Sequence, residues 1–265
     1  MKKSLLPIIG SLALLAVGAH AAAVIGLNIT DGWGTPCLLG ETADGSSNWT
    51  DSRAAGDWTD PSFGTVALDN SSGVSASWNS SNTWAGGNED TSEQQLYRVY
   101  LDDGDGGNSL VNGDGIGVSV TITGLGAWLA AEGATAYQVR VYASTDNDNA
   151  SFQPVDIRIG APDVGSPDLT ALSIAETVPV PAIGPGDFPP NTEPDPTWGL
   201  WQSRGYGDSS GSLTADTITL TVPARDGTTR GALAGFKITA VPEPGAIALL
   251  GLGFVTWLSA RRRKA

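Results

Sequence analysis

Short runs in which apolar and polar residues alternate recur along the middle of the chain. Residues 137–142 read Tyr-Gln-Val-Arg-Val-Tyr, so Gln138 and Arg140 would face one side of a strand, and Tyr137, Val139 and Val141 would face the other. Residues 118–123 and 217–222 repeat this period of two, which is typical of a strand with one buried and one solvated face. The alternation predicts antiparallel sheets packed face to face over a shared apolar core.

Further runs rich in β-branched and aromatic residues, bounded by Gly, Asn, Asp and Pro, extend this pattern. The predicted strands cover residues 24–29, 65–68, 74–78, 95–101, 117–123, 137–143, 155–159, 212–222 and 235–241. The helix-like stretch at residues 128–132 is too short to cover a sheet. The sequence therefore predicts an all-β fold, a single antiparallel β-sandwich of jelly-roll type, a class that includes galactose-binding-like sandwiches.

Two segments do not read as strands. Residues 31–61 are dense in Gly, Ser, Thr and Asp, and residues 161–198 form a proline-rich loop. The proline-rich loop either covers one sheet face or forms a hinge between two smaller units. We expect the first arrangement, and hence one β-sandwich ectodomain over residues 24–240.

The first residues have the features of a secretory signal peptide. Lys2 and Lys3 precede an apolar run over residues 5–17, and Ala19-His20-Ala21 supplies the small-x-small cleavage pattern. We expect signal peptidase to remove residues 1–23 or slightly fewer, and the protein to be exported across the inner membrane.

After removal of the signal peptide, the protein would lack residue types that many enzymes use for catalysis. The only histidine, His20, lies in the predicted signal peptide, and Cys37 is the only cysteine. The remaining domain therefore lacks a Ser-His-Asp triad, a histidine-based metal site and an internal disulfide. Residues 22–240 hold 8 basic and 27 acidic residues, a net charge of 8 − 27 = −19, which disfavours nucleic acid as a partner. We predict that the protein is not an enzyme.

Carboxylates remain as possible chemical groups. A glycan-active enzyme needs two facing acids and no histidine, and the ectodomain offers six glutamates: Glu41, Glu89, Glu93, Glu132, Glu176 and Glu193. Two acidic turns could instead hold Ca²⁺, since this ion prefers oxygen ligands. The weak calcium candidates are Asp103, Asp105, Asp146 and Asp148. Plain Asx turns are the favoured explanation of these residues, and no other cofactor is expected.

Tryptophans gather in the first third of the chain. Trp78 lies in a predicted strand and is expected in the core, whereas four others lie outside the predicted strands: Trp33, Trp49, Trp58 and Trp84. Exposed on the rim of a sandwich, these four could stack on sugar rings; otherwise they plug the ends of the sandwich.

The end of the chain carries a composite signal. Val241-Pro242-Glu243-Pro244 is followed by an apolar run over residues 245–260 and then by a basic cluster, Arg261, Arg262, Arg263 and Lys264. As a helix the apolar run would span about 24 Å, less than the ~30 Å hydrocarbon core of a bilayer. Basic residues after such a helix favour the cytoplasmic side.

This arrangement resembles the PEP-CTERM sorting tails of Gram-negative bacteria. In that family the Pro-Glu-Pro motif, the helix and the basic cluster are recognised together by an exosortase, a membrane-embedded cysteine transpeptidase. The resemblance, carried by residues 241–265, implies a protein held in the membrane by its C-terminal helix before processing and then delivered to the cell surface or the extracellular space.

Together these features predict an exported, exosortase-sorted, non-enzymatic protein of the cell surface or extracellular matrix, associated with exopolysaccharide. Two alternatives stay open. One is a carbohydrate-binding module that uses the tryptophans outside the strands, and the other is a carboxylate-dependent glycan-active enzyme.

Overall fold

A computed structural model describes the central part of the chain in detail. The described residues are 22–30, 48–52, 63–68, 73–85, 96–97, 99–103, 115–145, 151–163, 168–183, 203–224 and 229–242. The expected signal peptide, except its last two residues, and the expected membrane helix over residues 245–260 lie outside these ranges.

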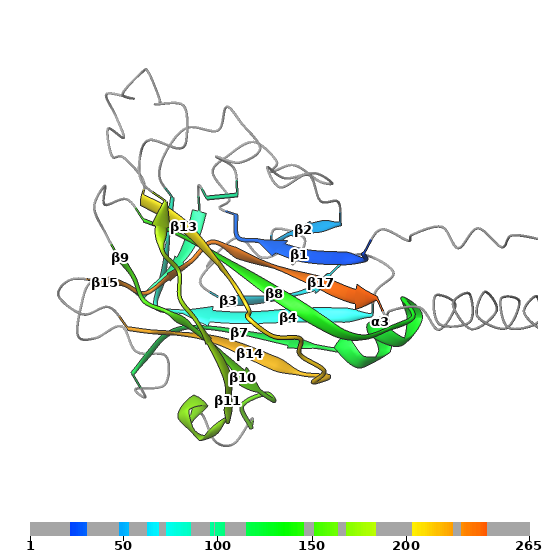
Figure 1. Ribbon diagram of the computed structural model, residues 1–265. Coiled ribbons are helices and arrows are strands. Elements are labelled where there is room, and N and C mark those ends of the chain that lie inside the picture. The colour runs from blue at the N-terminus through cyan, green and yellow to red at the C-terminus, as the bar shows by residue number, and fades with distance from the viewer. Residues whose placement is uncertain are drawn as a thin grey trace, which may run out of the picture.

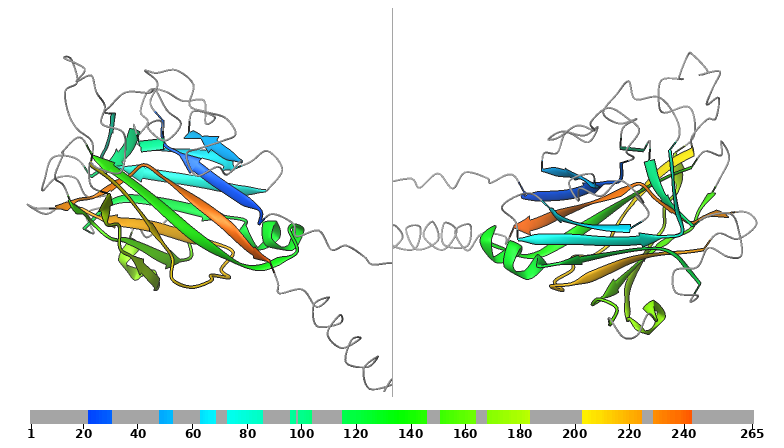
Figure 2. Two further views of the ribbon diagram at one scale, coloured as in Figure 1. Left: turned by 45° about the horizontal axis from the view of Figure 1, so that its top comes forward. Right: turned by 180° about the vertical axis from the view of Figure 1, so that it is seen from behind.

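Two six-stranded sheets form the body of the molecule (Figures 1 and 2). Sheet A has the order β12 (Ala182–Ile183), β13 (Ser203–Asp208), β8 (Ala134–Thr145), β17 (Gly235–Pro242), β1 (Val24–Asn28) and β2 (Trp49–Asp51). Sheet B has the order β11 (Ile174–Val178), β10 (Val155–Ile159), β14 (Ile218–Pro223), β7 (Ile116–Thr123), β4 (Val74–Ser80) and β3 (Phe63–Leu68). Neighbouring strands in both sheets are antiparallel, except that β1 and β2 pair in parallel.

Smaller elements complete the described part of the fold. A three-stranded sheet has the order β16 (Ala232–Leu233), β6 (Val99–Asp102) and β5 (Asn82–Ala85), and β9 (Ser151–Phe152) pairs with β15 (Thr229–Arg230). Helix α3 (Leu125–Ala131) lies at one end of the sandwich (Figure 1). A 3₁₀ turn, η2 (Leu169–Ala171), lies between β10 and β11.

The core lies between the two sheets. Every second residue of β7 and β14 is buried there, including Val120 and Leu220, and on sheet A the same holds for Val139 in β8 and Leu27 in β1. The residues between them turn to the outer face, by which we mean the face of each sheet that points away from the other sheet. The predicted all-β character, the antiparallel pairing and the core position of Trp78 are therefore confirmed.

Several predicted boundaries were wrong. The strand expected over residues 212–222 begins only at Ile218, because the preceding residues turn to meet helix α3: the Asp216 carboxylate accepts a hydrogen bond from the Gly126 N–H at 2.8 Å. The strand expected over residues 95–101 is β6, which starts at Val99.

The two segments that do not read as strands also contain some. Strand β2 lies inside residues 31–61, and β11 and β12 lie inside the proline-rich segment 161–198. Each of the three is an edge strand of its sheet. Prolines and short apolar runs are tolerated at a sheet edge because one side of the backbone has no neighbour to bond.

Candidate functional site

The structure describes only some of the residues that the sequence singled out. Trp49, Trp84, Asp103, Val241 and Pro242 lie in described segments. The other candidates lie outside the described residues: Trp33, Trp58, Asp105, Asp146, Asp148, Glu243, Pro244, Arg261, Arg262, Arg263 and Lys264.

The two described tryptophans have different surroundings. Trp49 lies in strand β2 rather than in a loop and is only 5% exposed; its ring packs over Gly26, where an added Cβ would come within 2.9 Å of Trp49 Cε3. Trp84 lies in β5 opposite Tyr100 and is 41% exposed. Of these two, only Trp84 presents ring surface that a sugar could reach.

Asp103 does not lie in an open turn. Its side chain is fully buried, and its N–H donates to the Gly231 carbonyl oxygen at 3.1 Å. Across the described ranges there is no group of three His, Cys, Asp or Glu residues arranged to hold a metal ion. Calcium binding therefore stays a prediction that depends on residues outside these ranges.

The described glutamates are Glu132, at the C-terminal end of α3, and Glu176, in β11. The Glu176 carboxylate accepts a hydrogen bond from the Ser210 backbone N–H, so it joins the edge of sheet B to the segment after β13. Glu41, Glu89, Glu93 and Glu193 lie outside the described residues.

Polar and aromatic residues form rows across the outer face of sheet A. The strand register places Tyr206, Tyr142, Gly235, Asn28 and Asp51 in one line across five strands. The adjacent row, listed in the same strand order, is Asp208, Arg140, Lys237, Gly26 and Trp49. Because the inward residues of these strands form the core, the two rows lie together on the side facing away from it.

The exposed end of these rows is a group of three side chains on β8 and β13. Arg140 donates from Nε and Nη2 to the two carboxylate oxygens of Asp208, at 2.6 and 2.7 Å. Its guanidinium carbon lies 4.6 Å from the ring centroid of Tyr206, a cation–π distance. Tyr206 is 40% exposed, and the hydrogen bonds to Asp208 raise the pKa of Arg140 although burial opposes this.

A buried aromatic cluster lies directly beside this group. Tyr142 is 3% exposed, and its ring centroid lies 5.7 Å from that of Trp49, 5.9 Å from that of Tyr97 and 6.4 Å from that of Tyr206. Aromatic rings at these separations and tilted angles stabilise one another. Tyr206 is thus the exposed member of a packed cluster.

The outer face of sheet B has a different character. Strands β3, β4 and β7 carry no charged residue, and their outward positions are mostly Ser, Thr and Asn. Hydroxyls bond across strands: Ser75 Oγ lies 2.9 Å from Thr123 Oγ1, and Thr121 Oγ1 lies 3.0 Å from Thr219 Oγ1.

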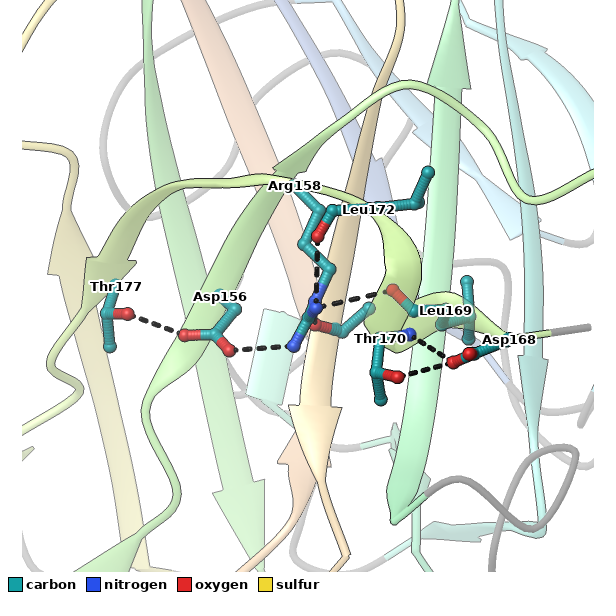
Figure 3. A network of polar contacts seen from close by, with 8 residues as sticks. Asp156, Arg158, Asp168, Leu169, Thr170, Leu172 and Thr177 are labelled. Atoms are coloured by element: carbon teal, nitrogen blue, oxygen red, sulfur yellow. Dashed lines mark hydrogen bonds and ion pairs between the residues drawn. The ribbon is translucent and has the colours of Figure 1, made fainter.

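At the other side of this face lies a buried arginine network (Figure 3). Arg158 Nε donates to Thr221 Oγ1 at 2.8 Å, Nη1 donates to the carbonyl oxygens of Leu169 and Leu172 at 3.3 Å, and Nη2 donates to Asp156 at 3.1 Å. Thr177 Oγ1 donates to the other Asp156 oxygen at 2.6 Å.

The 3₁₀ turn held by this network has its own cap. The Asp168 carboxylate accepts from the Thr170 hydroxyl and N–H, and these bonds lower the pKa of Asp168. The network ties the connection between β10 and β11 to the sheet, and we assign it a structural role.

Sequence reasoning missed most of the exposed group. The alternation of residues 137–142 placed Arg140 on an outward face, but Tyr206 and Asp208 lie in Ser-Arg-Gly-Tyr-Gly-Asp, which was not predicted as a strand. The signal that could have found them is the alternation of Gly205 and Gly207 with larger polar residues.

Comparison with known proteins adds one finding, which concerns the end of the chain. Residues 240–264 match the family model of the PEP-CTERM protein-sorting motif. No curated protein and no solved structure matches the chain. Over the residues that the structure describes, no helix is long and apolar enough to cross a membrane.

The matched residues include the proposed signal itself, Val241-Pro242-Glu243-Pro244, and the basic cluster that follows. The motif implies export, transient anchoring in the membrane through the C-terminal segment, and processing by an exosortase. Residues 240–264 thus identify the tail of the chain as a PEP-CTERM sorting signal.

Proposed function

We propose that this protein is a non-enzymatic component of the cell surface or extracellular matrix that associates with exopolysaccharide. The observation that carries the proposal is the sorting motif at residues 240–264, which begins inside the last strand, since β17 ends at Pro242. Folded domain and sorting address are therefore contiguous, and processing next to the motif would deliver the sandwich alone.

We also propose that residues 24–240 form one domain of jelly-roll type. Support comes from the strand order once the edge strands β2, β12 and the β3–β4 hairpin are set aside: β1-β17-β8-β13 in sheet A and β7-β14-β10-β11 in sheet B. In this arrangement the chain passes repeatedly from one sheet to the other and the first strand pairs with the last, as in a jelly roll built from two Greek keys.

The absence of enzymatic activity is supported by the sequence. No histidine follows His20, so the commonest general base is missing from the exported domain. The expectation would fail if the purified protein hydrolysed or eliminated any glycan substrate.

The experiment for sorting is intact-mass analysis with C-terminal peptide mapping of the protein from its native cells and spent medium. We expect the N-terminus to begin after Ala21 or Ala23, because signal peptidase removes the leader. We expect the residues beyond the Pro242-Glu243-Pro244 region to be missing from the surface or medium form. A tail retained through Ala265 in both fractions would overturn exosortase sorting.

A carbohydrate-binding module is the second candidate, favoured by the exposed ring of Trp84 in β5. Intrinsic fluorescence that changes on adding polysaccharide, and does so in the Trp84→Ala variant only to a reduced extent, would support it. A module of this kind is compatible with the matrix role, because it would be the part that holds the polymer.

A further inference from the structure

We propose that β8 and β13 carry a binding site for one ring of a neutral polysaccharide, in which the sugar packs on the exposed part of the Tyr206 side chain and bonds Arg140 and Asp208. This inference rests on the proposed association with exopolysaccharide, and it names a site and a ligand class for it. The site differs from the tryptophans that the sequence suggested.

Tyr206 supplies the apolar surface. A pyranose ring has a face of C–H groups that packs on an aromatic ring, and a tyrosine combines such a surface with a polar tip. Tyr206 is 40% exposed, while its neighbour Tyr142, at a centroid distance of 6.4 Å, is buried. The cluster behind Tyr206 limits its movement, so little side-chain entropy is lost when a ligand binds.

Arg140 and Asp208 supply the polar edge. The bidentate bonds of 2.6 and 2.7 Å hold the two groups together, and the guanidinium carbon of Arg140 lies over the Tyr206 ring, 4.6 Å from its centroid. A carboxylate can accept about four hydrogen bonds and a guanidinium can donate five, so the pair keeps capacity for sugar hydroxyls. The Asp208 side chain is 52% exposed and that of Arg140 is 29% exposed, which makes the pair accessible. Gln138, the next outward residue of β8, is also exposed.

Charge argues for a neutral ligand. Asp208 neutralises the guanidinium charge of Arg140 within the site. The other described basic residues of this face, Arg204 and Lys237, have interaction partners of their own. A domain whose residues 22–240 carry a net charge of 8 − 27 = −19 would also repel a polyanion at long range.

The test is binding of the full chain, purified in a detergent without sugar groups, to neutral and acidic polysaccharides by affinity electrophoresis. A neutral β-glucan, a neutral α-glucan, a galactan and an alginate would serve as probes, each at low and high salt. The variants are Tyr206→Ala and Tyr206→Phe, with Ile174→Ala and Phe63→Ala as controls. The controls suit the purpose because Ile174, in β11, is 50% exposed and Phe63, on the outer face of sheet B, is 55% exposed.

We expect salt-independent retention by at least one neutral polysaccharide, weakened about tenfold by Tyr206→Ala and little by Tyr206→Phe, Ile174→Ala or Phe63→Ala. Unchanged retention in Tyr206→Ala would overturn this site while leaving the association with polysaccharide intact. Retention by alginate alone, abolished by salt, would overturn the neutral ligand class. No retention of the unmodified chain by any polysaccharide would instead refute the proposed function itself.

Discussion

The two outer faces each carry an Asp–Arg pair, and the pairs differ in burial far more than in chemistry. On sheet B, Arg158 and Asp156 are 3.1 Å apart with side chains 8% and 14% exposed. On sheet A, Arg140 and Asp208 are closer, at 2.6 Å, but 29% and 52% exposed. We nevertheless expect the Arg158–Asp156 pair, although longer, to contribute more to the free energy of unfolding, because water competes less for buried partners.

The partners of the two arginines explain this difference. Arg158 bonds a hydroxyl, two backbone carbonyls and a carboxylate, so it joins β10, β14 and the 3₁₀ turn. Arg140 bonds the Asp208 carboxylate, lies over the Tyr206 ring and interacts with the Tyr142 side chain. One arginine holds the fold together, and the other is displayed on its surface.

The strongest test of this comparison is Arg158→Ala. The substitution would leave the Asp156 carboxylate and the carbonyls of Leu169 and Leu172 without their buried donor. We expect the free energy of unfolding to fall by about 3–5 kcal/mol. Urea unfolding, extrapolated linearly to water, measures this loss.

Thr221→Val is the matched control for that experiment, because it keeps the shape of the side chain and removes only the acceptor of Arg158 Nε. A loss of about 1–3 kcal/mol is expected from one unsatisfied buried donor. If Arg158→Ala lowered the free energy of unfolding no more than Thr221→Val does, the bonds from Arg158 to Leu169, Leu172 and Asp156 would contribute nothing to stability. The proposed difference in stability between the two Asp–Arg pairs would then be wrong.

The second test is Arg140→Ala. Because both partners are solvated, we expect the unfolding free energy to fall by less than about 1 kcal/mol despite the shorter distance. The same urea titration measures it, and Asp208→Ala should give a similar value. A loss of several kcal/mol from either variant would make this pair structural and weaken the case for a binding site.

The smallest expected effect concerns Asp168, at the exposed end of the Arg158 network. Its pKa is lowered in the folded protein by the bonds from Thr170. The ionised form is therefore favoured by folding, and its contribution is present at neutral pH and lost as the pH falls through the folded pKa.

Asp168→Asn should consequently leave stability at pH 7 nearly unchanged, since asparagine also caps a turn. It should slightly flatten the loss of stability on acidification toward pH 3, as followed by urea unfolding at a series of pH values. A loss at pH 7 as large as that of Arg158→Ala would show that the cap, rather than the buried arginine, holds the turn.

The strands in which apolar and polar residues alternate could be predicted, whereas β13, which lies between β12 and β8 in sheet A, could not. Residues 118–123 and 155–159 alternate because one face of each is buried, and their predicted ranges agree closely with β7 and β10. In β13 the inward positions are Gly205 and Gly207, so the strand has no apolar signal. Added Cβ atoms there would come within 2.3 Å of Pro181 O and 2.2 Å of Pro179 O. Residues 179–181 pass so close to β13 that they leave no room for a side chain at these two positions, which explains why both are glycine.

By itself, the sequence determined the sorting tail and the two-sided strands, because both are written in consecutive residues: a short motif at residues 240–264 and a period of two. Only the tertiary structure decided which outward-facing polar residues form the buried network around Arg158 and which form the exposed group around Arg140. Arg140 and Asp208 are 68 residues apart, and Arg158 and Thr221 are 63 apart. Their meeting depends on non-local strand pairing and on what covers each face, which local patterns do not encode.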